Sequence, residues 1–267
     1  MDNNSTVRTE LRWDINPVDF LEAGTLPVDT KLGHWVLHEG RAVLRLATAE
    51  NPLTDLTAAA ARMELEAMLL IRSVAIDQYF TLSHGPAITQ QSPSGEYLIV
   101  PLEGGVIQMK GGAIDVMIKE DASAAIRDDL KITEMETGAV LIDTAAQRSS
   151  VQKAHMEAGL PQMIKSEALL YMHKSYCQSL ADPGNALVHL GEIKDALSKT
   201  LGSAKAAEAA MPSAAWNTLG KIANALPVNE SRHRGAHFEN LRPATQAELH
   251  RARAAAKQLI EAFKKLV

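Results

Sequence analysis

The sequence contains a single cysteine, Cys177, among its 267 residues. One cysteine cannot form an intramolecular disulfide, so the stability of the fold must come from a packed core, and this usage is typical of a reducing compartment. Aromatic residues are also scarce, at 4% of the chain. The core is therefore expected to consist mainly of Leu, Ala, Val, Ile and Met.

Long hydrophobic runs are missing as well. The most apolar stretch, residues 67–76, is interrupted by Arg72 and is much shorter than the roughly 20 residues that span a bilayer. The first five residues are polar and lack the basic-then-apolar order of a signal peptide. We therefore expect a cytoplasmic protein that does not enter a membrane.

Acidic and basic residues are distributed unevenly. Residues 1–150 contain 22 Asp and Glu against 12 Lys and Arg, whereas residues 151–267 contain 10 against 15. A basic C-terminal half suggests contact with an anion. Attraction between the two oppositely charged halves is at least as good an explanation.

Extended segments dominate the first 120 residues. Alternating apolar positions and glycine-separated apolar runs are typical of strands and hairpins. Residues 56–82 instead carry apolar side chains at three- and four-residue spacing, which predicts one long helix. A doubly wound nucleotide-binding fold is disfavoured, because the sequence has no Gly-rich phosphate loop and no regular βαβ alternation. The predicted extended segments are 7–15, 34–47 with a turn near Gly40, 97–102, 106–110 and 113–118.

The pattern becomes helical from about residue 122, and glycine becomes sparse. Pro161 and four other breaks separate the expected helices. The last helix has the clearest start, because Thr245 and Glu248 have the spacing of a capping box. We predict an α+β fold, with a mixed, mainly antiparallel β domain at 1–125 and a helical bundle at 140–267. The expected helices are 122–131, 145–158, 162–180, 185–201, 203–210, 213–225 and 245–265.

A basic segment stands shortly before the last helix. Residues 231–237 contain Arg232, His233, Arg234 and His237. Arginine binds phosphate oxygens through paired donors, and an imidazole titrates near neutral pH. This combination suits metal-independent RNA cleavage, in which an imidazole takes the proton of the 2′-hydroxyl and an arginine stabilises the charge on phosphorus. A solvated turn, or ion pairs with an acidic neighbour, are the alternatives. Neither a metal nor a cofactor is predicted.

The spacing of this segment resembles the signature of the HEPN superfamily, which is an arginine, a polar residue and then a histidine four to six residues beyond the arginine. That signature implies a usually dimeric helical bundle in which two copies of the motif form one RNase site. The wider run, about 180–267, also resembles an uncharacterised group of bacterial HEPN-like sequences. By position, Arg232 would stabilise the phosphate, His237 would transfer the proton and His233 would modulate the site. Arg234 and Arg242 are the predicted substrate-binding residues. The matching segments are 185–197, 216–224, 232–235 and 241–248.

Two hypotheses of different classes follow. The first is a HEPN-type ribonuclease or toxin that acts on RNA as a homodimer, in stress or phage defence. The second is a non-enzymatic two-domain protein whose helical half dimerises or binds a partner or an anion. A further histidine, His189, is expected to be a capped or ion-paired surface residue rather than a catalyst, because Glu192 lies one helical turn away.

Overall fold

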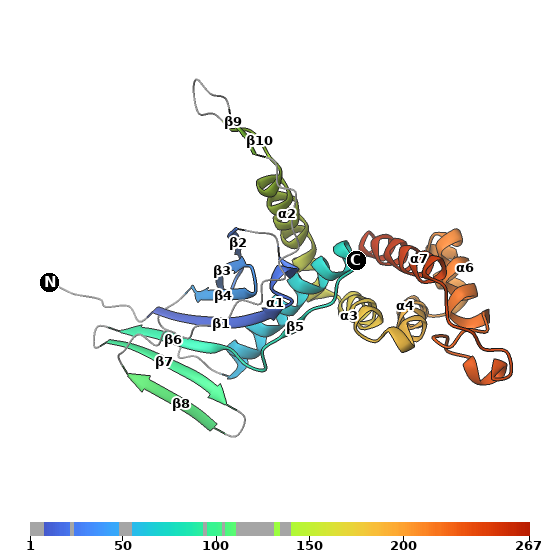
Figure 1. The fold of residues 1–267 in the computed structure, drawn as a ribbon, viewed down its shortest axis with the longest axis horizontal. Helices are drawn as coiled ribbons and strands as arrows, with labels where there is room; N and C mark the ends of the chain where they lie inside the picture. The colour runs from blue at the N-terminus through green and yellow to red at the C-terminus, as the bar shows by residue number, and fades with distance from the viewer. Residues whose placement is uncertain are drawn as a thin grey trace. The chain divides into compact units, whose positions relative to one another are not determined.

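The structure is a computed structural model, shown in Figure 1, with most of the described strands in the first half of the chain and most of the described helices in the second. The predicted α+β class is confirmed. The chain forms two compact units, Met1–Leu65 with Phe80–Glu157, and Glu66–Tyr79 with Ala158–Val267. Both units are discontinuous in sequence, whereas the predicted domains, 1–125 and 140–267, are continuous segments. The structure describes residues 8–21, 24–47, 55–92, 95–102, 105–110, 131–133 and 140–267.

The first unit contains an antiparallel sheet. Its strand order is β2-β3-β4-β1-β6-β7-β8, and β5 pairs with β1. The hairpin predicted at 34–47 is confirmed as β3 and β4, which turn at Gly40 with a φ of 66°. The strands predicted at 97–102 and 106–110 are confirmed as β7 and β8, while the one predicted at 113–118 lies outside the described residues. The strands are β1 Arg8–Asn16, β2 Leu26–Asp29, β3 Gly33–His38, β4 Arg41–Leu46, β5 Thr81–Leu82, β6 Ala87–Ser92, β7 Gly95–Leu102 and β8 Gly105–Lys110.

The predicted alternation in β1 produces the core of this sheet. Leu11, Trp13 and Ile15 are buried, because every second side chain of a strand points to the same face. The centroids of the Trp13 and Trp35 rings are 5.7 Å apart, and Trp35 lies on β3. Trp35 Nε1 donates a 3.0 Å hydrogen bond to the buried carboxylate of Glu64 in α1 (Asp55–Ile76). The first part of α1 therefore belongs to the core of the sheet unit.

A second, two-stranded sheet precedes α2 (Thr144–Lys165). It pairs β9 (Lys131–Thr133) with β10 (Val140–Asp143), and Ile132 stands opposite Ile142. The helix predicted at 122–131 lies outside the described residues except for Lys131, which is in a strand, so the helical prediction is wrong there. β-branched residues favour the extended backbone, and in so short a segment their preference leaves no periodic signal.

Helices form the second unit. The start predicted for the last helix is confirmed. The Thr245 hydroxyl accepts a hydrogen bond from the Glu248 amide, and the Glu248 carboxylate accepts one from the Thr245 amide. The helix predicted at 213–225 is confirmed as α6 followed by a π-helical turn over Lys221–Ala225. The helices of this unit are α3 Glu167–Ala181, α4 Ala186–Thr200, α5 Ala204–Ala210, α6 Ser213–Gly220 and α7 Gln246–Lys264.

Pro161 does not end a helix, contrary to the prediction. It lies inside α2, which continues to Lys165 before Ser166 caps α3. Proline removes one backbone donor from a helix but does not prevent packing of its apolar face. Leu160 and Met163 on either side of Pro161 are buried, so tertiary packing offsets the lost hydrogen bond.

The core of the helical unit lies where α3, α4 and α7 pack together. The end of α1 joins them, because Asp77 accepts hydrogen bonds from the Tyr176 hydroxyl on α3 and from the Lys257 ammonium on α7, the latter at 2.9 Å. In the described part of the chain, no helix combines the length and the apolar character needed to cross a membrane. The buried residues at the centre include Leu169, Met172, Leu190, Leu197, Leu259 and Phe263.

Candidate functional site

The predicted motif lies in a closed loop, residues 229–242, which we call the basic loop. Its base is fastened by a parallel bridge between Val228 and Arg242, with the Asn229 amide donating to the Arg242 carbonyl at 3.0 Å. Ser231 is fully buried, and its hydroxyl donates to the Val228 carbonyl. A short 3-10 turn over Arg234–His237 follows. The motif is therefore presented by an anchored loop and not by an α-helix.

Arg232 is held against α4 by an ion pair. Its Nη1 lies 2.7 Å from Asp195 Oδ2, and its backbone amide donates to the Ala223 carbonyl in the π-helical turn. A Cβ atom on Gly191 would lie 2.8 Å from Arg232 Cδ, so the absence of a side chain there makes room for the arginine. The side chains of Arg232 and Asp195 are 31% and 57% exposed. An ion pair this open to solvent contributes about 0–1 kcal/mol and can exchange its carboxylate for another anion.

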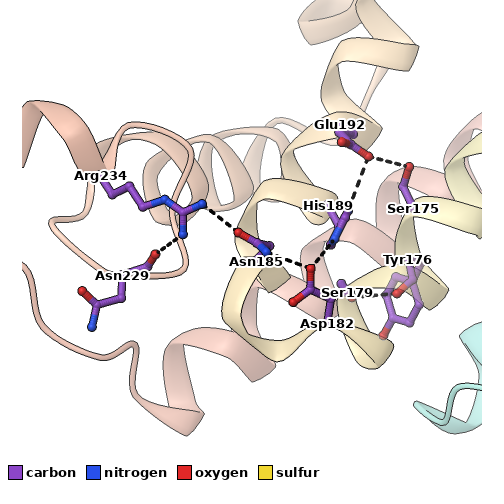
Figure 2. Close-up of polar contacts among 9 residues, drawn as sticks. All are labelled: Ser175, Tyr176, Ser179, Asp182, Asn185, His189, Glu192, Asn229 and Arg234. Atoms are coloured by element: carbon purple, nitrogen blue, oxygen red, sulfur yellow. Dashed lines mark hydrogen bonds and ion pairs between the residues drawn. The ribbon is translucent and has the colours of Figure 1, made fainter.

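Arg234 is held differently, by two neutral oxygen atoms. Its Nη1 donates to the Asn229 carbonyl at 3.0 Å, and its Nη2 donates to Asn185 Oδ1 at 2.8 Å. Figure 2 shows the guanidinium lying between these two partners. Neither partner carries a negative charge, so the contacts orient the guanidinium without compensating its charge.

Asn185 begins a chain of polar contacts that runs along α4 towards α3, which we call the polar chain (Figure 2). Asn185 Nδ2 donates to Asp182 Oδ2 at 2.8 Å, and the same oxygen lies 3.3 Å from His189 Nε2. The other ring nitrogen of His189 is 3.8 Å from Glu192 Oε2, which accepts a hydrogen bond from the Ser175 hydroxyl. His189, predicted to be a capped or ion-paired surface residue, thus lies between two carboxylates, with 20% of its side chain exposed. Hydrogen bonds from Asn185 and His189 hold the pKa of Asp182 below its usual range.

Arg242, a predicted substrate-binding residue, forms a bidentate pair with Glu248. Its two terminal nitrogens donate to the two carboxylate oxygens at 2.8 and 2.6 Å. Hydrogen bonds from Arg242 and then from the Thr245 amide lower the pKa of Glu248 to about 2. An anion that bound Arg242 would have to compete with this carboxylate, which is also part of the α7 cap.

The two histidines of the motif lie at the ends of the short turn. His233 precedes it, with its carbonyl accepting the Ala236 amide and its side chain exposed. The backbone of His237 ends the turn, while its imidazole lies outside the part that the structure describes. Among the contacts of the described side chains, Arg232 and Arg234 share no partner. The two predicted phosphate-binding arginines are thus close in sequence but are held by different groups.

Two of the groups that organise the site were not predicted from the sequence. Asn185 positions Arg234, which lies 49 residues further along the chain. Asp195 positions Arg232, which lies 37 residues further along. Asn185 directly follows Asp182-Pro183-Gly184, which signals a turn but indicates no partner. Only the packing of the basic loop against α4 brings these residues together.

The site offers no metal centre in the described residues, since no three His, Cys, Asp or Glu side chains are grouped to bind an ion there. No known protein family, no curated protein and no solved structure matches the chain. The resemblance to the HEPN superfamily therefore remains a prediction.

Proposed function

We propose that the helical unit binds RNA through the basic loop and cleaves it without a metal ion, as a HEPN-type endoribonuclease or toxin. The observation that carries this proposal is the guanidinium of Arg234, which is oriented at the exposed loop by neutral partners and keeps its positive charge for an anion. A forked guanidinium binds phosphate through paired donors, as it binds a carboxylate.

An exposed aromatic side chain in the same loop supports RNA as the source of the phosphate. Phe238 follows the 3-10 turn directly, and 73% of its surface is exposed. Single-stranded RNA is commonly bound by stacking its bases on exposed aromatic rings beside basic residues. A phosphate on Arg234 and a neighbouring base on Phe238 would together recognise a flexible strand.

The proposed chemistry gives a step to His237 and to Arg232 and a modulating role to His233. His237 accepts the 2′-hydroxyl proton, the 2′ oxygen attacks phosphorus, the bond to the 5′ oxygen breaks, and an imidazole returns a proton to that leaving oxygen. Arg232 exchanges Asp195 for the phosphate and stabilises its added charge. His233 stands beside Arg232 as the modulating residue. The imidazole that returns the proton comes from the second copy of the motif in the homodimer that the HEPN resemblance implies. The protein would act in stress or phage defence.

The decisive experiment is cleavage of a labelled RNA pool by the full chain in the presence of EDTA. His237→Ala is expected to lower the rate by at least about 100-fold, the usual contribution of a proton-transfer group, and to leave the melting temperature unchanged. His250→Ala, which alters an exposed histidine on α7, is the matched control and should cleave like wild type. Equal activity of the His237→Ala variant and wild type would overturn the assignment.

A second candidate function is favoured by the ion pairs of Arg232 with Asp195 and of Arg242 with Glu248. These pairs fit a non-enzymatic protein in which the basic loop is a structural connection and the helical unit dimerises or binds a partner. The same experiment separates the candidates. If wild type leaves all RNA intact, and Arg232→Ala lowers the melting temperature or the dimer fraction in light scattering, the second function holds.

A further inference from the structure

The orientation of Arg234 depends on a residue outside the basic loop. One of its two hydrogen bonds goes to the loop itself, at the Asn229 carbonyl, and the other goes to the side chain of Asn185, the last residue of the turn Pro183–Asn185 that precedes α4. Without Asn185, the guanidinium would retain one partner and could rotate about it. Asn185 therefore fixes the direction in which Arg234 points.

The amide of Asn185 is itself fixed by the polar chain. Its Nδ2 donates to Asp182 Oδ2 at 2.8 Å, and this contact turns its oxygen towards Arg234. Asp182 is anchored in turn by His189, 3.3 Å away. Each member thus limits the rotation of the next, which is the arrangement that holds a functional side chain in one geometry.

The neutrality of Asn185 distinguishes it from the partners of the other two loop arginines. Arg232 and Arg242 face the carboxylates of Asp195 and Glu248, which compensate their charges. An amide oxygen accepts the same hydrogen bond without adding a negative charge. Asn185 is therefore suited to position a guanidinium that must still attract an anion.

We propose that Asn185 is a positioning residue that holds Arg234 ready for an RNA phosphate, with Asp182 anchoring its amide. The proposal rests on the RNA-binding part of the proposed function and does not require cleavage. Asn185 acts through Arg234, so its contribution must vanish when Arg234 is absent.

A double-mutant cycle tests this dependence. The probe is a fluorescein-labelled single-stranded RNA in which 2′-O-methyl groups prevent cleavage, and fluorescence anisotropy gives its Kd at several salt concentrations. Arg234→Ala should weaken binding. It should also make the plot of log Kd against log salt concentration less steep, by the amount expected for the loss of about one phosphate contact. Asn185→Ala should weaken binding about 3- to 10-fold, the effect of one hydrogen bond, and should have no further effect in the Arg234→Ala background.

Two further variants separate positioning from a general structural role. Asn185→Asp retains an oxygen acceptor for Arg234 but adds a negative charge, so it should bind RNA at least as weakly as Asn185→Ala. Asn217→Ala, at an exposed asparagine on α6, should behave as wild type. Melting temperatures of all variants show whether the fold is intact.

The outcomes distinguish the two proposals. If wild type does not bind the RNA, both the proposed function and the positioning role are overturned. If wild type binds and Arg234→Ala weakens binding, the positioning role alone is overturned by either of two results: Asn185→Asp binding like wild type, or Asn185→Ala having the same effect with and without Arg234.

Discussion

Arg242 at the base of the basic loop and Arg234 in its exposed part are held in opposite ways. Arg242 forms a bidentate pair with a carboxylate that also caps α7. Arg234 donates hydrogen bonds to two neutral oxygens, neither of which compensates its positive charge. The comparison teaches that one arginine serves to fasten the loop, whereas the other is positioned to bind an anion. Position in the loop alone does not distinguish them, because both are exposed residues in the same short segment.

The largest expected effect is the loss of stability in acid. His173 and the Arg242–Glu248 pair both contribute to it, so the contribution of His173 is measured first. His173 on α3 is almost fully buried, and its Nδ1–H donates to the Leu169 carbonyl at 2.9 Å. Burial lowers its pKa from 6.5 to about 4. The unfolded chain therefore binds a proton that the folded chain does not, and the free energy of unfolding should fall by about 3 kcal/mol as the pH drops from 6.5 to 4.

His173→Gln should remove most of that pH dependence, because glutamine keeps a donor and does not titrate. Chemical denaturation between pH 7 and pH 4 measures it, with His250→Gln as the exposed control. If the His173→Gln variant lost stability over this range as steeply as wild type, burial of His173 would not be the cause, and the acid sensitivity would have to be sought among the carboxylates.

The next effect concerns the base of the loop. Glu248→Gln removes the carboxylate that holds Arg242 and weakens the α7 cap, so the helical unit should lose about 1–2 kcal/mol at pH 7. This value allows for solvent screening, since 44% of the Arg242 side chain is exposed. In wild type, the pKa of about 2 means that this contribution is present above about pH 4.5 and is lost as the pH falls towards 2.

Hydrogen exchange of the first α7 amides reports the effect locally. Glu261→Gln is the matched control on the same helix, because Glu261 pairs with Lys264 at the surface, where such a pair contributes less than about 0.5 kcal/mol. Equal protection of the α7 amides in both variants would show that the Glu248 carboxylate does not stabilise the start of α7.

The sequence predicts contacts between residues that are close in the chain better than contacts between distant residues. The capping box of Thr245 and Glu248 spans three residues, and the alternation of Leu11, Trp13 and Ile15 spans four, so both leave a local pattern. The short strands β9 and β10 are too brief to show a period. The same holds for the functional contacts: the sequence predicts a basic loop, but the partner of Arg234 stands 49 residues earlier and is set by packing.

The smallest expected effect is also the most direct test of the comparison. Arg234→Ala removes two hydrogen bonds from an exposed guanidinium to neutral oxygens. Water replaces both partners at the surface, so the free energy of unfolding should change by less than about 0.5 kcal/mol. Arg242→Ala breaks the pair with the poorly accessible Glu248 carboxylate and should cost at least twice as much. Parallel urea titrations of the two variants measure the difference. If Arg234→Ala lowered the free energy of unfolding as much as Arg242→Ala, Arg234 would itself be a structural part of the loop. Its two hydrogen bonds would then be explained by stability, and they would give no reason to expect an anion there.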